Sequence, residues 1–424
     1  MSRTGAEVIV VGTGAIGACI GYELSRRGTR VHLIDSAAEP AAGCSRANAG
    51  LIAPSHSEPL TGAANIRTGL RSMMRRDASV HIRPSPGMLP WLLRFGMASS
   101  EAQVTAATRV LRDLGLSSLG QYRRYQEMGI DTSFEAQGLI DVFETDEALR
   151  HAVRSLESAP LDLEYDVLDA HQVQREIPGI ATAQGGIHFR HEAQCDSRRL
   201  AESLLQEAAG LGAEISFETR VRALAQQNGR VIGVETEQGR FEADHVVVAA
   251  GHHSAALARS AGVRLPIAPA KGYVVDLEPG AGDPLQPVGV KSSMIVVTPY
   301  QDRVRLAGTL ELVGTDTSID GQRTDAIRDA ANRALPALAS RRTLSTWAGL
   351  RPCSADGLPI IGQTSRAKNL TLATGHGQQG VLLAPGTARL VAAQLHGEAD
   401  ERLQHFSPDR FRRFWPGKAG QRNS

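Results

Sequence analysis

The first residues that could do chemistry form a glycine pattern suited to holding a phosphate group. Gly12, Gly14 and Gly17 follow an apolar run and open a stretch in which apolar residues recur at helical spacing. In this pattern the first glycine makes a tight turn, the second lets the backbone approach a pyrophosphate, and the third lets helix and strand pack closely. Ala15 and Ile16 would lie at the helix N-terminus, where backbone amides bind anions.

Asp35 strengthens this interpretation. It ends a second apolar run, residues 30–34, and follows Gly17 by 18 residues. A carboxylate at the tip of the second strand can accept hydrogen bonds from ribose hydroxyls. A strand, a glycine turn, a helix, a strand and a terminal acid together predict a dinucleotide site, whereas the glycines alone would be a weak signal.

A second glycine turn opens another helix near the end of the chain. A strand pattern at residues 369–374 is followed by the turn and by an apolar helix over 381–395; the turn residues of interest are Gly375, His376, Gly377, Gly380 and Val381. Two helix N-termini on one sheet could hold a long cofactor at both ends, with its pyrophosphate at the first and a redox ring at the second. His376 could bond to that ring or merely fill the turn.

Two further segments are expected beside the cofactor. A small, polar, glycine-flanked loop follows the second strand and leads into apolar residues; its candidate residues are Ser45, Asn48, Ala49 and Gly50. The apolar run at 245–251 ends in Gly251 and has the pattern of a buried parallel strand. Ligands of open α/β sheets bind at such carboxyl strand ends.

Arg351 is the candidate for substrate binding. It lies in a Gly-Leu-Arg-Pro segment, and a guanidinium fork can hold a carboxylate by two parallel hydrogen bonds. Tyr273, Tyr300 and His56 are further candidates for the catalytic site. Each of the four could instead have a purely structural role, because surface arginines and sheet tyrosines are common.

Composition narrows the functional classes. The 424 residues carry 46 basic and 45 acidic side chains, so nucleic acid is not expected as a partner. The four cysteines have no metal-ligand spacing, which predicts free thiols and no metal site. No apolar run is long enough to span a bilayer, and the strand pattern begins too early for a signal peptide. We expect a cytoplasmic protein, with peripheral membrane contact by the amphipathic stretch 88–95 as the alternative to covering the core.

The motifs together resemble the D-amino-acid oxidase superfamily of FAD flavoproteins. The matching segments cover nearly the whole chain and keep the family's order: GTGAIG with Asp35, SRANAG, VVVAAG, WAGLRPCSADGLPIIG and ATGHGQQGVLLAPGTARL. Residues 271–273, 306–312 and 90–95 are most similar to the bacterial D-amino-acid dehydrogenase small-subunit group. The closing segment also resembles glycine oxidase.

The resemblance implies an α/β, bipartite flavoprotein, in which a Rossmann-like FAD domain carries an inserted antiparallel-sheet substrate domain. The implied FAD domain is discontinuous, over 1–57, 150–262 and 346–397. Residues 58–149 and 263–345 would form the substrate domain, and 398–424 a C-terminal tail. Alternating strand patterns between residues 264 and 312 fit such a sheet.

The resemblance also assigns roles to single residues. Val221 matches a backbone contact to adenine, and Arg351 matches the arginine that clasps the substrate carboxylate. Cys353 does not match the spacing of the family cysteines that attach the flavin covalently, so noncovalent FAD is expected.

The implied activity is oxidative deamination of a D-amino acid, or of a cyclic D-imino acid such as a proline derivative. Hydride would pass from Cα to flavin N5, and a quinone or carrier protein would accept the electrons. Three alternatives remain open: an oxidase that uses oxygen, a subunit of a hetero-oligomeric opine or hydroxyproline dehydrogenase, and a catalytically silent flavin-binding protein.

Overall fold

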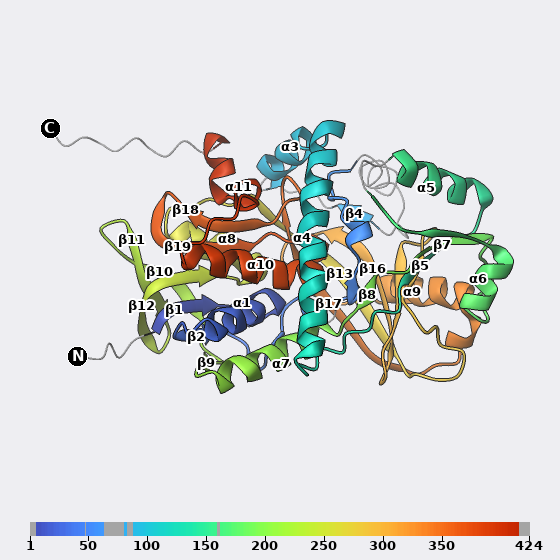
Figure 1. Cartoon of the computed structure of the whole chain (residues 1–424), viewed down its shortest axis with the longest axis horizontal. Coiled ribbons are helices and arrows are strands. Elements are labelled where there is room, and N and C mark those ends of the chain that lie inside the picture. Colours follow the sequence, from blue (N-terminus) through green and yellow to red (C-terminus); the bar gives the residue numbers. More distant parts are fainter. Residues whose placement is uncertain (1–5, 47, 63–79, 83–87, 159–161, 415–424) are drawn as a thin grey trace.

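The computed structural model describes residues 6–46, 48–62, 80–82, 88–158 and 162–414. Two units, each built on a large sheet, lie side by side, and the long helix α4 (Glu101–Glu127) runs between them (Figure 1). The bipartite α/β architecture is therefore as expected.

The first sheet has eight strands, and five of them, β19, β12, β1, β2 and β9, form a continuous parallel run. Its order is β10-β11-β19-β12-β1-β2-β9, with β18 added antiparallel to β19. The strands are β1 (Ala6–Val11), β2 (Val31–Ile34), β9 (Glu214–Ser216), β10 (Val221–Gln227), β11 (Arg230–Thr236), β12 (Gly239–Val248), β18 (Ile360–Thr364) and β19 (Ala367–Thr374). The runs predicted as buried strands, β1 and the end of β12, pair directly in parallel.

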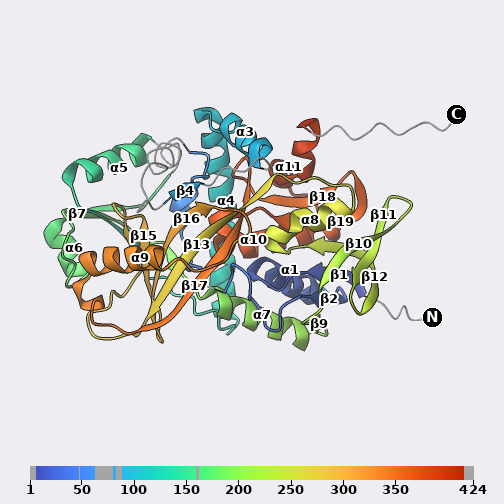
Figure 2. The same ribbon diagram turned by 180° about the vertical axis from the view of Figure 1, so that it is seen from behind.

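Helices cover both faces of this sheet. On one face, buried residues of four helices share a core with it: α1 (Ala15–Arg26), α4, α7 (Ser197–Gly210) and α10 (Gly380–Leu395). The short α8 (Ser254–Ser260) packs on the opposite face, which Figure 2 presents. The helix predicted over 381–395 is confirmed, and α1 and α10 both begin at the glycine turns.

The second sheet has nine strands in the order β17-β13-β16-β15-β14-β5-β7-β6, with β4 paired to β16. Its strands are β4 (Val80–Ile82), β5 (Leu139–Phe143), β6 (Asp166–Asp169), β7 (Gly185–Phe189), β13 (Ile267–Leu277), β14 (Val288–Val290), β15 (Ile295–Pro299), β16 (Val304–Leu312) and β17 (Thr343–Ser354). Helices α6 (Ala170–Glu176) and α9 (Gly321–Ala334) pack on one face. Helix α5 (Asp146–Ser158) packs against Phe143 of β5 and against Ile187 and Phe189 of β7. A two-stranded ribbon joins β3 (Leu51–Ile52) to β8 (Ala193–Gln194).

The strand pairing differs from the expected division of the chain at several points. Strands β6 and β7 follow residue 150, but β7 pairs with β5 and β6 pairs with β7, so both belong to the second sheet. Strand β17 joins that sheet through β13, although it overlaps the segment expected in the first unit. Conversely, α4 packs on α1 and α10. Beyond α10, the described part of the tail, α11 (Leu403–Phe406) and the 3-10 turn Pro408–Phe414, also packs on the first unit.

Helix α3 (Leu89–Met97) forms an amphipathic cover. Trp91 stacks on Phe95 and donates its indole N–H to the Cys353 carbonyl at 3.0 Å. On its outer side three apolar residues are exposed: Leu89, Leu93 and Met97.

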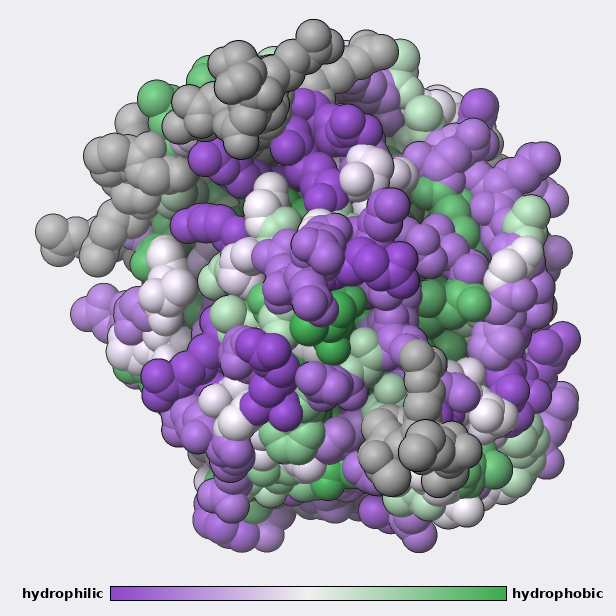
Figure 3. All heavy atoms as spheres, turned by 90° about the vertical axis from the view of Figure 1, so that its left-hand side faces the viewer, coloured by the Kyte–Doolittle hydropathy of each residue, from purple (hydrophilic) through white to green (hydrophobic). Residues whose placement is uncertain are grey.

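Membrane contact by this stretch stays a prediction. Among the described residues no helix combines the length and apolar character that crossing a membrane requires, and the face at the β10–β12 end is mostly hydrophilic (Figure 3).

Candidate functional site

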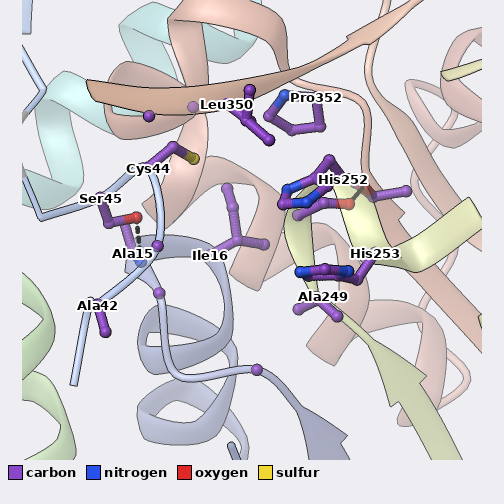
Figure 4. Close-up of a pocket in the computed structure, with 18 of the residues that line it drawn as sticks. Ala15, Ile16, Ala42, Cys44, Ser45, Ala249, His252, His253, Leu350 and Pro352 are labelled. Atoms are coloured by element: carbon purple, nitrogen blue, oxygen red, sulfur yellow. Dashed lines mark hydrogen bonds between the residues drawn. The ribbon is translucent and has the colours of Figure 1, made fainter. Parts of the chain in front are cut away.

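A cavity of about 840 Å³ lies where the carboxyl ends of the first sheet's strands meet β13 and β17 of the second. Fifteen of the residues singled out from the sequence line it: Gly12, Gly14, Ala15, Ile16, Asp35, Ser45, Asn48, Ala49, Val221, Gly251, Arg351, His376, Gly377, Gly380 and Val381. They come from opposite ends of the chain and from both units. Figure 4 shows how α1, the 42–45 loop, the end of β12 and the β17 strand surround the space.

The first glycine turn is shaped by close backbone approaches. Gly12 has a φ of +109°, and a Cβ there would lie 2.6 Å from the carbonyl oxygen of Ala249. A Cβ on Gly17 would overlap the carbonyl of Gly12. Gly17 therefore allows strand and helix to pack but does not line the cavity. Gly14 does line it, so the side-chain-free backbone faces the space where a pyrophosphate would lie.

Side chains around the turn hold it in shape. Ser45 Oγ accepts a hydrogen bond from the Ala15 amide at 3.0 Å (Figure 4). Asp35 Oδ2 accepts from the amide and hydroxyl of Thr13 at 2.7 and 2.9 Å, and Oδ1 accepts from the Ala37 amide. Each carboxylate oxygen can accept two hydrogen bonds, so Oδ1 keeps capacity for a ribose hydroxyl.

Two histidines at the end of β12 were missed by sequence reasoning. His252 and His253 directly follow Gly251, line the cavity, and have ring centroids 3.9 Å apart (Figure 4). Burial, with a smaller contribution from His253, lowers the pKa of His252 to about 4. The pKa of His253 is lowered too, mainly by burial. Both rings are neutral at pH 7, and neutral imidazoles can donate to or accept from a ligand. Their position directly after an apolar strand is the sequence feature that could have identified them as cavity residues.

The second glycine turn follows β19. Gly375 and Gly377 have φ values of +77° and +56°, conformations that glycine adopts at low cost. Gly377 lines the cavity and Gly375 does not. His376 is buried in the turn, its Nε2 lies 3.0 Å from the Thr387 hydroxyl, and burial lowers its pKa to about 3. Its ring nitrogen thus bonds within the protein.

Arg351 reaches this turn from β17. Two residues further along, Cys353 forms an isolated bridge with His376. The Arg351 Nη1–H donates to the Thr309 carbonyl at 3.0 Å, and burial lowers the guanidinium pKa. No carboxylate of the described residues forms an ion pair with it. Arg351 is partly buried, and a cation withdrawn from water without an anionic partner is costly, so this geometry favours an anionic ligand.

The other three candidates for the catalytic site do not line the cavity. Along β13, Gly272 and Val274 face it, and because side chains alternate along a strand, Tyr273 points to the α9 side. There its hydroxyl donates to Glu311 at 2.9 Å. His56 Nε2 lies 2.9 Å from Asp141 Oδ2, so its ring is engaged away from the cavity.

Tyr300 instead supports the loop beside the cavity. Its hydroxyl donates to the Cys195 carbonyl, and a Cβ on Gly50 would overlap this hydroxyl. Gly50 itself does not line the cavity. Its absence of a side chain lets the loop pack against Tyr300, which explains why glycine is found there.

Comparison with known proteins identifies the family. The family model described as DAO, FAD dependent oxidoreductase, matches residues 7–394. The chain belongs to this family. Its cofactor is therefore FAD, and the resemblance drawn from the motifs is confirmed.

Curated relatives and solved structures agree over almost the whole length. The D-amino acid dehydrogenase of Sinorhizobium medicae (strain WSM419) is 32% identical over 398 residues, covering 91% of this chain and 95% of that protein. That of Rhodopseudomonas palustris (strain HaA2) is 30% identical, covering 93% and 95%. The glycine oxidase structure from Geobacillus kaustophilus shares the fold with a TM-score of 0.75 at 24% identity, covering 96% and 99%.

The residues present fit FAD. The Gly12–Gly17 turn leaves bare backbone and a helix N-terminus for the pyrophosphate, and Asp35 offers a carboxylate oxygen to a ribose. Val221 lies at the start of β10 on the cavity wall, where the resemblance puts a backbone contact to adenine. The 377–381 turn directs the N-terminus of α10 into the far end, where a positive dipole end favours negative charge on a reduced ring.

Proposed function

We propose that this FAD-dependent oxidoreductase oxidises a D-amino acid, or a cyclic D-imino acid, at the bond between Cα and nitrogen. The observation that carries the proposal is Arg351, a partly buried cation that lines the cavity near the second glycine turn, with no ion pair to any described carboxylate. The names of the curated relatives support the D configuration. The substrate side chain is left to the experiment below.

The protein contributes to the reaction by binding the substrate and orienting its Cα–H bond. The substrate carboxylate accepts hydrogen bonds from the free edge of the Arg351 guanidinium, since Nη1 already donates to Thr309. With one end of the substrate fixed, the Cα–H bond is held towards the 377–381 turn at reacting distance. The neutral amine loses a hydride from Cα and becomes an iminium ion. Water hydrolyses this ion to the 2-oxo acid and an ammonium ion, or, for a cyclic substrate, to an open-chain amino 2-oxo acid that keeps the nitrogen. FAD, when bound, supplies the hydride acceptor.

For the electron acceptor we propose a quinone or a carrier protein rather than oxygen. The support is the similarity to D-amino acid dehydrogenases over nearly the full chain. A partner subunit of a hetero-oligomeric dehydrogenase would fill the same role.

An anaerobic bleaching experiment tests the proposal. Purified holoprotein is mixed with D-amino acids, their L enantiomers, glycine and proline derivatives, and the flavin absorbance is followed. We expect D-amino acids to bleach it and L enantiomers to leave it yellow. If no amine in the panel bleaches the flavin, or only L enantiomers do, the proposed substrate class is wrong.

Admitting an acceptor to the bleached protein then tests the electron route. Stopped-flow reoxidation should be slow in air and fast with a quinone or phenazine. Hydrogen peroxide formed stoichiometrically, at the rate of dye-linked turnover, would make the protein an oxidase. Bleaching followed by poor turnover with every acceptor would point to a missing partner subunit.

We further propose that the FAD is bound noncovalently. Cys44 is the cysteine that lines the cavity, and burial raises the pKa of its thiol, which disfavours the reactive thiolate. Acid precipitation should release all the flavin, and mass spectrometry should identify it as FAD. Flavin that stays with the precipitated protein would contradict noncovalent binding.

A further inference from the structure

Two glycines face each other where the substrate arginine meets the sheet. In the antiparallel pairing of β13 and β17, Gly272 lies opposite Gly349, and Arg351 lies opposite Ala270. Gly272 and Gly349 both line the cavity. Facing residues of such a pair would ordinarily cover the surface between them with side chains, so the pair leaves a bare patch of backbone.

The Arg351 guanidinium occupies this patch. A Cβ built on Gly272 would overlap Cζ and Nη2 of Arg351 and would lie 2.7 Å from Nη1. The guanidinium therefore lies directly on the Gly272 backbone. A Cβ on Gly349 would instead overlap the indole of Trp347, so this indole fills the neighbouring part of the patch.

A bulge in the next strand fixes one edge of the guanidinium. The register between β13 and β16 shifts between Lys271 and Tyr273, and Thr309 in the shifted stretch has a φ of +65°. This conformation is strained for a β-branched residue, and strained backbone is retained where the surroundings enforce it. Its carbonyl accepts the Nη1–H of Arg351 at 3.0 Å.

We propose that Gly272 is a positioning residue for Arg351. Its bare Cα lets the guanidinium lie against the sheet and reach the Thr309 carbonyl, and this leaves the opposite edge of the fork directed to the substrate carboxylate. The inference rests on the proposed function, since it assigns Gly272 a role in holding that carboxylate. It concerns a residue that carries no charge and donates no side-chain bond.

The variant Gly272→Ala tests the idea with a single methyl group. Gly272 does not have a positive φ, so alanine is compatible with its backbone. The three nearest atoms that the methyl would meet belong to the far end of a flexible side chain, and we expect the strand pairing to survive. The guanidinium must move, which costs about 10- to 100-fold in kcat/KM for the best D-amino acid of the panel.

A double-mutant cycle with Arg351→Lys separates positioning from general damage. If Gly272 acts through the guanidinium, the methyl group should change kcat/KM less than about threefold when lysine replaces the arginine. FAD content, the flavin absorbance spectrum and the unfolding midpoint of Gly272→Ala should match the wild type.

Three outcomes would overturn the inference: unchanged kcat/KM in Gly272→Ala, an equal loss in the Arg351→Lys background, or loss of FAD. These differ from a failure of the proposed function, in which the wild-type flavin is not bleached by any D-amino acid.

Discussion

Two arginines in the same sheet have opposite surroundings. Arg305 on β16 is 3% exposed and makes a bidentate pair with Asp276 at 2.8 and 2.9 Å. Its Nη1–H donates to the Asn48 carbonyl at 3.0 Å. Arg351 on β17 has one hydrogen bond to a carbonyl and no ion pair with any described carboxylate. Burial alone would lower both pKa values, but Asp276 raises that of Arg305, whereas that of Arg351 remains lowered.

The difference separates a structural cation from a binding cation. Arg305 completes its pair within the protein and uses its remaining edge to hold the cofactor loop, which Thr298 also holds by donating to the Ala49 carbonyl at 2.7 Å. Arg351 is left for an anion that none of the described carboxylates supplies. Removing one member of a buried ion pair leaves the other charge buried without compensation, which is strongly destabilising. Removing an unpaired cation leaves no such charge behind.

The largest expected effect is on stability, in Arg305→Met. This change removes the bidentate partner of Asp276 and leaves it only a 3.7 Å ion pair with Arg303 and a hydrogen bond from Ser345. We expect a loss of about 3 kcal/mol in the free energy of unfolding, the lower end of the range for a broken buried pair. FAD retention should also fall, because the Asn48 carbonyl loses its donor. Urea unfolding and flavin content are the measurements. Arg342→Met is the matched control: its pair with Glu278 is exposed, so less than about 1 kcal/mol is expected. An unfolding midpoint as high in Arg305→Met as in the control would contradict the assignment of Arg305 as a structural cation.

The next effect is on activity, in Arg351→Lys. Lysine keeps the charge but cannot make two parallel hydrogen bonds. We expect about 1.5–3 kcal/mol of lost transition-state binding, or roughly 10- to 150-fold in kcat/KM. Flavin content and the unfolding midpoint should stay at wild-type values. Unchanged steady-state kinetics would remove Arg351 from the substrate site.

A smaller effect extends the comparison to a buried neutral group, His376. Its folded-state pKa is about 3, whereas an unfolded histidine has a pKa of about 6.5. The unfolded state therefore binds the extra proton, and stability falls as the pH drops from about 6.5 towards 3. Between pH 7 and 5 this should cost about 1–2 kcal/mol more than in His376→Gln. Parallel stability–pH curves for the two proteins would show that His376 does not titrate as described.

The smallest expected effect is that of Arg351→Met on stability. The change removes one hydrogen bond to a carbonyl and one desolvated charge, which act in opposite directions. We expect the free energy of unfolding to change by less than about 1 kcal/mol. A loss like that of Arg305→Met would mean that Arg351 has an internal partner after all.

Local sequence was sufficient for the cofactor side of the site. The first glycine turn, Asp35 and the turn after β19 follow from residues close together in the chain, because turn chemistry and helix starts are local properties. Tyr273 could not be placed in this way. Which face of β13 meets the cavity depends on its pairing with β16 and β17. The alternation of side chains alone therefore does not tell whether Gly272 or Tyr273 faces the cavity.

Pairing between distant strands also explains the difference in domain bounds. The residue patterns of β6 and β7 do not tell which sheet these strands join, because the pattern of β7 is compatible with an edge strand of either sheet. Similarly, the pairing of Arg305 with Asp276 joins residues 29 apart in the chain. Among 46 basic side chains, sequence alone does not say which are paired.

The order of strands in the first sheet has a consequence for how the chain folds during synthesis. Val8 pairs with His245, and Val246 pairs with Leu370. At about 5–20 residues per second, the last of these strands leaves the ribosome roughly 20–70 s after the first. Until then β12 has an open edge of apolar residues, which is prone to wrong pairing. The flavin cavity is therefore expected to be completed, and the flavin to bind, only after β19 and the turn that follows it have left the ribosome.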